Sequence, residues 1–288
     1  MQSLDYCPNP DCHAEIHWTA DRCSVCNQDL GAPNQRLANR EHEVNALKQR
    51  YQAAVEEASQ RGISQELAEF EQHLVSQSQA VINCTAKFLF GFISDNNQLY
   101  ANYRQQTASA TRKAAELSND RQRCGTEGIL YGTMANRIVY AALALNEQGL
   151  VSYGVCAMIM RDITMQNKAT VLEENSYDFV RRHKILPGDK PPAGYQAHWQ
   201  NRRLLAVAKL ASRIQPNTRD FASLLLTTNG KRNEDEFIEV HIYDNFDKQA
   251  IAKLALPRKN PNDAIERALL SGINDYALHH NIACYYYD

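Results

Sequence analysis

Two segments near the start of the chain carry apolar residues at helical spacing. Over residues 35–58 the apolar positions recur every three or four residues, with Glu, Lys, Arg and Gln between them. This pattern predicts an amphipathic helix. Arg61-Gly62 interrupts it, and Ser64 can cap a second helix whose apolar stripe continues to residue 79. We therefore predict a helical hairpin arm over residues 32–80.

The predicted arm carries no chemistry of its own, because its polar face is simply charged. A spacer or an arm that forms a dimer is one interpretation of such a hairpin. A docking site for a regulatory protein is the other.

Beyond residue 80 the apolar positions fall into short runs separated by turn residues, a texture typical of strands. The runs cover residues 81–92, 138–145, 155–160, 169–172, 221–227 and 237–243. Helical spacing returns at 198–214 and 263–279, and an aromatic segment at 282–287 is consistent with a closing strand. We therefore expect an α+β protein with a mixed-sheet domain over residues 81–288.

The strand predicted at 237–243 separates its side chains by chemistry. Ile238, Val240 and Ile242 share one face, whereas Glu239 and His241 share the other. Asn229-Gly230 precedes this strand and can form a hairpin turn with positive backbone angles. Farther upstream, residues 187–195 have the turn composition of a long surface loop that could cover a cleft.

Cysteine spacing adds a separate module at the N-terminus. Cys7 and Cys12 form one pair, and Cys23 and Cys26 form a second pair after a gap of ten residues. Four thiolates suit the tetrahedral preference of zinc and leave no open position, which indicates a structural ion. We therefore predict a zinc ribbon over residues 1–31. The nearby histidines, His13 and His17, are expected to remain outside the ligand set.

Composition and charge limit the classes of partner. The chain is 44% hydrophobic and 22% charged, with a formal net charge of -2. No run approaches the about 18 apolar residues of a membrane span, and no secretory signal opens the sequence. We expect a cytoplasmic protein without a membrane partner. A nucleic acid would need a local basic patch, and the polar face of helix 198–214 is the best candidate.

Several short segments, taken in order, resemble an uncharacterised bacterial domain family related to the ADP-ribosyltransferase toxins. They are residues 103–109, 119–121 with Glu127 and Tyr131-Gly132, 137–143, 153–156, 169–171 with Asn175-Ser176, and 238–243. The chain departs from that family in two places. It has Cys84-Thr85-Ala86-Lys87 where the family has His-Pro-Asp-Arg, and Phe237 where the toxins have a Gln or Glu two residues before the catalytic Glu.

The resemblance implies that NAD is the substrate and that the reaction passes through an oxocarbenium-like transition state, as in glycoside cleavage. Glu239 would be the catalytic carboxylate. Residues implied to bind NAD form three groups: Arg104, Arg123 and Arg137 for the pyrophosphate, Tyr131 or Tyr153 for stacking on nicotinamide, and Ser176 and Thr107 for orienting the ribose or supporting Glu239.

Each assignment has a structural alternative. Glu239 could be a solvated charge on an outer strand face, Arg137 could pair with Glu127 or Glu147, and Ser176 could only cap a helix. The two tyrosines could be ordinary core or rim residues.

The function implied is an intracellular NAD-dependent ADP-ribosyltransferase, a toxin of a toxin-antitoxin or phage-defence system. Its partners would be a protein or nucleic-acid acceptor and an antitoxin or other regulatory protein. Two alternatives stay open: an NAD glycohydrolase that uses the same pocket, and a zinc-ribbon adaptor without catalysis.

Overall fold

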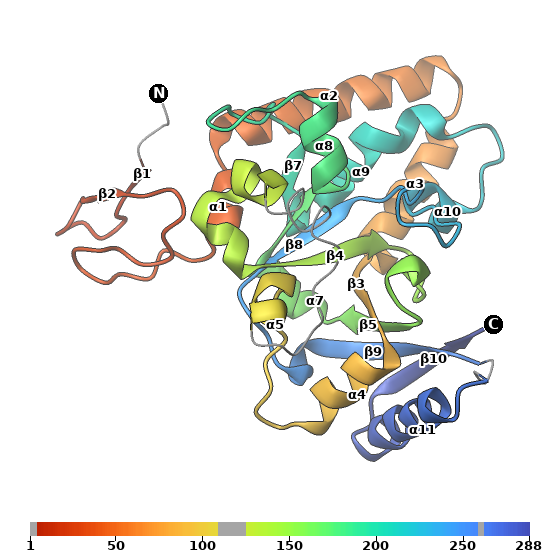
Figure 1. Cartoon of the computed structure of the whole chain (residues 1–288). Helices are drawn as coiled ribbons and strands as arrows, with labels where there is room; N and C mark the ends of the chain where they lie inside the picture. The colour runs from red at the N-terminus through yellow and green to blue at the C-terminus, as the bar shows by residue number, and fades with distance from the viewer. Residues whose placement is uncertain (1–4, 109–124, 259–261) are drawn as a thin grey trace.

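An eight-stranded mixed sheet forms the centre of the computed structural model, which describes residues 5–108, 125–258 and 262–288 (Figure 1). The strand order is β10-β9-β5-β3-β4-β8-β6-β7. Only β9 and β10 pair in parallel, and the other neighbours are antiparallel. The predicted α+β class and mixed sheet are confirmed. The bounds are β3 Gln79–Cys84, β4 Ile138–Ala144, β5 Cys156–Met160, β6 Ala169–Leu172, β7 Gln196–His198, β8 Glu239–Tyr243, β9 Ile251–Pro257 and β10 Ala283–Tyr287.

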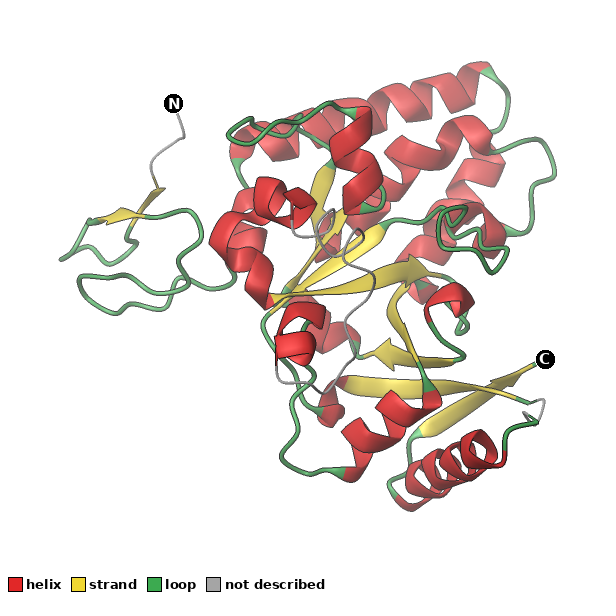
Figure 2. Cartoon of the chain, in the orientation of Figure 1, coloured by secondary structure: helices red, strands yellow, loops and turns green. Residues whose placement is uncertain are grey.

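One face of the sheet packs against long helices (Figure 2). Val139, Val240 and Ile242 point to this face, and they share one apolar core with residues of the longer helices. The alternation of side chains along each strand therefore sends one set into this core. The helices are α2 Glu41–Gln60, α3 Ser64–Gln77, α4 Ala86–Ser94, α9 Arg202–Leu210 and α11 Ala264–His279.

The opposite face of the sheet is covered by shorter elements. Around β4, β8 and β6, Ile138, Leu172 and Tyr243 pack with α8, the 128–137 segment and the start of α1. Glu239 and His241 point to this same face, because they alternate with Val240 and Ile242. The remaining elements are β1 Asp5–Tyr6, β2 Glu15–Ile16, α1 Pro33–Ala38, α5 Tyr103–Ala108, α7 Asp162–Gln166, α8 Ser176–Arg182, α10 Phe221–Leu225, and the 3-10 helices η1 Gly132–Arg137, η2 Val151–Tyr153, η3 Trp199–Asn201, η4 Ala211–Arg213 and η5 Lys248–Ala250.

The predicted helical hairpin is present as α2 and α3, but it packs directly on the sheet domain. Leu47 from α2 and Leu74 from α3 lie in the same core as the strands. The Arg61 guanidinium donates to the carbonyl oxygens of Ala211 and Ile214 at 3.1 and 2.6 Å. Because its apolar stripe is buried in this way, the hairpin is part of the main core.

The first predicted helix is divided into α1 and α2 at residues 39–40. The reason is visible in α1, whose polar side chains reach the sheet. Asn34 donates to the carbonyl oxygens of Lys168 and His241 at 3.1 Å, and Gln35 donates to that of Gln166 at 2.9 Å. These bonds fix the direction of α1 and so prevent one continuous helix.

Two predicted strands are wrong in part or whole. The run 81–92 forms the end of β3 and then α4, because the Thr85 side chain caps the helix by accepting from the Phe88 N–H. The run 221–227 begins as α10, where Asp220 accepts from the Ser223 N–H. A short apolar run does not separate strand from helix, so the capping residue decides the outcome.

We predict that Leu74→Ala lowers the free energy of unfolding by about 2–5 kcal/mol, because it opens a cavity in the core. Leu74 is 0% exposed, whereas its neighbour Val75 is 63% exposed. Val75→Ala is therefore the matched control, with an expected change within about 0.5 kcal/mol. Urea denaturation measures both, and similar losses in the two variants would contradict the packing of α3.

Candidate active site and metal centre

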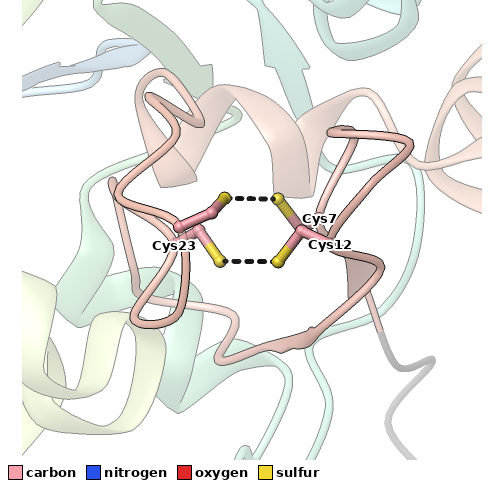
Figure 3. Close-up of side chains that lie close together, drawn as sticks. Cys7, Cys12 and Cys23 are labelled. Carbon is pink, nitrogen blue, oxygen red and sulfur yellow. Dashed lines mark hydrogen bonds between the residues drawn. The ribbon is translucent and has the colours of Figure 1, made fainter.

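The four N-terminal cysteines form a compact cluster (Figure 3). The Sγ atoms of Cys7 and Cys26 are 3.5 Å apart, those of Cys12 and Cys23 are 3.7 Å apart, and all four lie within 4.8 Å of one another. Tetrahedral zinc with Zn–S bonds of about 2.3 Å requires sulfur separations of about 3.8 Å. The cluster therefore fits an ion such as zinc with four thiolate ligands, as the spacing predicts.

The segment that carries these cysteines, residues 5–31, is called the cysteine module below, and arginines attach it to the sheet domain. Arg137 pairs with Asp21 at 2.6 Å and with Asp244 at 2.9 Å. Arg40 pairs with Asp5 at 2.9 Å. Arg36 donates to carbonyl oxygens of the module, including that of Ala20 at 2.6 Å. These contacts fix the position of the module.

The module also packs tightly beside Tyr131. A Cβ added to Gly132 would lie 2.9 Å from the Trp18 ring, and Gly132 has a φ of +53°. The hydroxyls of Thr19 and Thr133 are 2.9 Å apart. Only glycine suits position 132, since a larger residue would push Trp18 away.

Glu239 lies in a buried polar cluster with residues from three elements. The carboxylate, in a residue that is 6% exposed, accepts from the Ser176 N–H at 2.9 Å and from the Ser176 hydroxyl. His241 Nε2 is 3.0 Å from the same oxygen, Oε2. The interpretation of Glu239 as a solvated charge on an outer face is therefore wrong. A buried carboxylate requires such donors.

Tyr131 closes this cluster from the opposite side. Its hydroxyl is 3.4 Å from Ser176 Oγ and 3.0 Å from His241 Nδ1. Burial raises the pKa of the Tyr131 hydroxyl well above its usual value, and the Glu239 charge adds to this effect. The phenol therefore stays protonated and can serve as a hydrogen-bond donor.

The cluster contains Ser, His and Glu, but its geometry differs from a serine-hydrolase triad. Both Ser176 Oγ and Glu239 Oε2 approach the same His241 nitrogen, Nε2, at 3.4 and 3.0 Å. A triad requires the nucleophile and the carboxylate on opposite nitrogens of the imidazole. This arrangement instead surrounds one carboxylate oxygen with donors.

A cleft of about 1250 Å³ opens next to the cluster. Its walls come from the cysteine module, the start of α2, the 128–134 segment, β6 and the 188–196 loop. Tyr131 and Thr170 belong to both the cleft wall and the surroundings of His241. The predicted surface loop is thus one wall of the cleft. Tyr131 lines the cleft and contacts the cluster through Ser176 and His241, whereas Glu239 is not among the lining residues.

The structure brings together three of the predicted site residues, Glu239, Ser176 and Tyr131. Arg104 instead pairs with Glu127 at 2.7 Å, and the Thr107 hydroxyl donates to the Arg104 carbonyl oxygen at 3.0 Å. Neither lines the cleft.

Two further predicted residues lie elsewhere, and one is outside the described residues. Arg137 pairs with Asp21 and Asp244, so the expected partners Glu127 and Glu147 are wrong. Tyr153 lies under the Arg232 guanidinium, 4.6 Å from its ring centre, and packs with a separate apolar cluster. Arg123 falls in the part of the chain that the structure does not describe.

The charges of the predicted basic face on helix 198–214 are paired with other groups of the same chain. Arg203 pairs with Glu71 at 3.1 Å, and Arg213 pairs with Glu236. Lys209 points inward and donates to the carbonyl oxygens of Glu173 at 2.6 Å and Phe237 at 3.1 Å.

Lys209 is a residue of this site that sequence patterns place on the solvent side. Its two bonds tie the end of β6, which leads to Ser176, to the start of β8, which carries Glu239. Burial lowers its pKa to about 8. Asn34 is a second such residue, since its buried amide donates to Thr170 Oγ1 at 3.2 Å and to the His241 carbonyl oxygen. In the sequence, the position of Asn34 directly after Pro33 predicts only the start of a helix.

We predict that the purified protein contains a single zinc ion per chain and that Cys23→Ser lowers its zinc content and its melting temperature. Structural zinc contributes directly to folding, and loss of one thiolate opens the ligand set. Plasma mass spectrometry measures the metal. Cys284→Ser, outside the cluster, is the control. A metal-free wild type with unchanged melting in Cys23→Ser would contradict the assignment.

The lowered pKa of Lys209 predicts a pH effect on stability. Between a folded pKa of about 8 and an unfolded pKa of about 10.4, the unfolded chain binds more protons. The contribution of Lys209 to the free energy of unfolding therefore rises with pH between these two pKa values. Urea titrations should show a steeper rise for wild type than for Lys209→Met. Lys48→Met removes an exposed lysine and should keep the wild-type slope; equal slopes in all three proteins would contradict the prediction.

No protein-family model matches the chain. A search of curated proteins finds no match either. The chemistry of this protein must therefore be inferred from its own residues, which build a shielded carboxylate cluster beside a large cleft.

Proposed function

We propose that this protein is an NAD-dependent ADP-ribosyltransferase with Glu239 as its catalytic carboxylate. The observation that carries the proposal is the Glu239 cluster: a buried carboxylate with donors on one oxygen, directly behind the wall of a cleft. The order of segments that resembles the ADP-ribosyltransferase toxins supports the same assignment. In this proposal the eight-stranded sheet is a version of the transferase domain, and the cysteine module is a zinc ribbon.

The proposed reaction breaks the bond between ribose C1′ and the nicotinamide nitrogen. The bonding electron pair leaves with nicotinamide, and positive charge develops on the ribose. A fixed carboxylate stabilises that charge without reorganisation during the reaction. The Ser176 N–H, the Ser176 hydroxyl and His241 all contact Oε2 of Glu239. We therefore propose that the other carboxylate oxygen, Oε1, faces the ribose and stabilises its positive charge.

The cleft supports a dinucleotide substrate in size and lining. Its volume of about 1250 Å³ exceeds the usual range of about 300–1,000 Å³ for small-molecule pockets. Tyr131 offers an aromatic surface for nicotinamide next to the carboxylate cluster. For the pyrophosphate we assign Arg40 and Lys190, which line the cleft, in place of Arg104 and Arg137, which do not line it.

In this proposal Tyr131 moves for the reaction, because Tyr131 lines the cleft and contacts Ser176, whereas Glu239 does not line the cleft. Its hydroxyl makes hydrogen bonds to Ser176 and His241, which a ligand can replace. We propose that ADP-ribosylation of the acceptor is toxic to the cell that makes the protein, as in a toxin-antitoxin or phage-defence system. The acceptor would be a protein or a nucleic acid, and an antitoxin would control the activity.

The shielding of Glu239 favours a second candidate. A protein that binds a ligand in the cleft without cleaving it needs no access to the carboxylate, and the cluster would then only stabilise the sheet. This is the adaptor interpretation of the sequence. NAD hydrolysis without transfer remains a variant of the first proposal, since it uses the same carboxylate.

We predict that purified wild-type protein, incubated with adenylate-labelled NAD and a bacterial lysate, releases nicotinamide and labels an acceptor. Glu239→Gln should lower nicotinamide release by about 100-fold or more, the usual loss when an electrostatic group of this kind is removed. Glu234→Gln changes an exposed loop carboxylate and should act like wild type.

Counting protein, RNA and DNA fractions separately identifies the acceptor class. Nicotinamide release without label would indicate a glycohydrolase. Absence of both from wild type would contradict the enzyme and leave the binding protein.

A further inference from the structure

A buried hydrogen-bond acceptor in the wall of the cleft has no partner. Asn34, the second residue of α1, lines the cleft and is 3% exposed. Its amide oxygen, Oδ1, is buried and makes no hydrogen bond with any of the described residues. Most buried polar side-chain atoms in proteins are paired, so an unpaired one requires a specific explanation.

The nitrogen of the same amide is fully used. Asn34 Nδ2 lies 3.1 Å from the carbonyl oxygens of Lys168 and His241, and 3.2 Å from Thr170 Oγ1. Backbone carbonyl oxygens only accept hydrogen bonds, so the nitrogen must face them. Rotation of the amide would place Oδ1 against these two acceptors. The structure therefore holds Oδ1 in position for a donor that the described part of the chain does not supply.

The contacts of Asn34 place it beside the Glu239 cluster. Thr170 and His241 are paired across β6 and β8, and Asn34 contacts both of them. The His241 ring in turn lies 3.0 Å from the Tyr131 hydroxyl and 3.0 Å from Glu239 Oε2. Asn34, Thr170 and Tyr131 all line the cleft. The unpaired acceptor is therefore connected through His241 to the residue proposed to stack on nicotinamide.

The cleft wall also contains an unpaired donor. Arg40 lines the cleft, and its Nη2 pairs with Asp5 at 2.9 Å. Its Nε is buried and, like Asn34 Oδ1, has no partner among the described residues. An acceptor at Asn34 and a donor at Arg40 complement a ligand that carries both an N–H group and anionic oxygens. NAD carries both, in its carboxamide and its pyrophosphate.

We infer that Asn34 Oδ1 accepts a hydrogen bond from the carboxamide N–H of nicotinamide and so positions the ring on Tyr131. This inference rests on the proposed function, and it names the residue that distinguishes the substrate from its close analogues. The bond leaves the contacts of Asn34 Nδ2 in place. Dinucleotides of nicotinic acid would be excluded, because an ionised carboxylate has no hydrogen to donate.

The ligand side of this bond can be changed without altering the protein. The acetylpyridine analogue of NAD keeps the carbonyl group on the ring and replaces only the amide nitrogen by a methyl group. The hypoxanthine analogue keeps the carboxamide and loses the amino group of adenine. Affinities for NAD and both analogues are measured by calorimetric titration of full-length Glu239→Gln, in which slow cleavage keeps the ligands intact. Titration of wild type with NAD checks that this variant still binds.

We expect the acetylpyridine analogue to bind at least about 10-fold more weakly than NAD, because it leaves the buried acceptor unpaired. The hypoxanthine analogue should bind like NAD. When Asn34→Ala is added to the same protein, NAD should lose its advantage over the acetylpyridine analogue.

Gln35→Ala is the matched control. Gln35 also holds α1 to the sheet domain, since it donates to the carbonyl oxygens of Gln166 and Ala169, but it does not line the cleft. The variant should therefore keep the full preference for NAD. Melting temperatures check that each variant is folded.

Equal affinities of Glu239→Gln for NAD and the acetylpyridine analogue would overturn the inference, whether or not Asn34→Ala folds, and would leave the proposed function intact. A preference for NAD that persists in folded Asn34→Ala assigns the carboxamide to another residue. A weaker affinity for the hypoxanthine analogue that depends on Asn34 places adenine there instead. Absence of NAD binding by both wild type and Glu239→Gln rejects the proposed function and the inference together.

Discussion

The burial of one negative charge organises the middle of this protein. A carboxylate taken out of water is stable only when hydrogen-bond donors replace the lost solvent. Glu239 meets that condition with Ser176 at the start of α8 and His241 on its own strand. The requirement links β8, β6 and α8, and Tyr131 completes it from the 128–131 segment. The cleft wall takes its shape from the same contacts.

Arginine provides the second level of organisation. Arg36, Arg40 and Arg137 hold the cysteine module through carbonyl oxygens and carboxylates, and Arg50 holds the cleft loop against α2. A planar guanidinium can join two or more chain segments at once. The protein therefore uses its basic residues to assemble distant parts of one chain, and the basic side chains of α9 are likewise paired within the chain.

Sequence patterns predicted the elements whose structure depends on residues only a few positions apart. The cysteine pairs, the α2–α3 hairpin, the surface loop and the strand with Glu239 and His241 on one face all follow from spacing within a few residues. The side chains that meet at the site come from segments far apart in sequence, and no pattern indicates such meetings. Asn34, Glu43 and Lys209 illustrate this limit, because each has an ordinary surface sequence context and a buried tertiary role. Arg137 illustrates the opposite case. Its sequence context predicted a role in NAD binding, but the structure pairs it with Asp21, 116 residues away.

The contact between Trp18 and Gly132 has a consequence for synthesis of the chain. The cysteines lie within 19 residues of one another, so their cluster can close as soon as they leave the ribosome. Arg36 and Arg40 follow the module closely, but the part of its docking surface at Gly132 and Thr133 lies 114 residues later, as the Thr19–Thr133 contact shows. At about 5–20 residues per second, about 6–23 seconds pass before that part of the docking surface exists. During that time the module's indole edge faces solvent, and a ribosome-associated chaperone would meet this apolar surface before the cleft is formed.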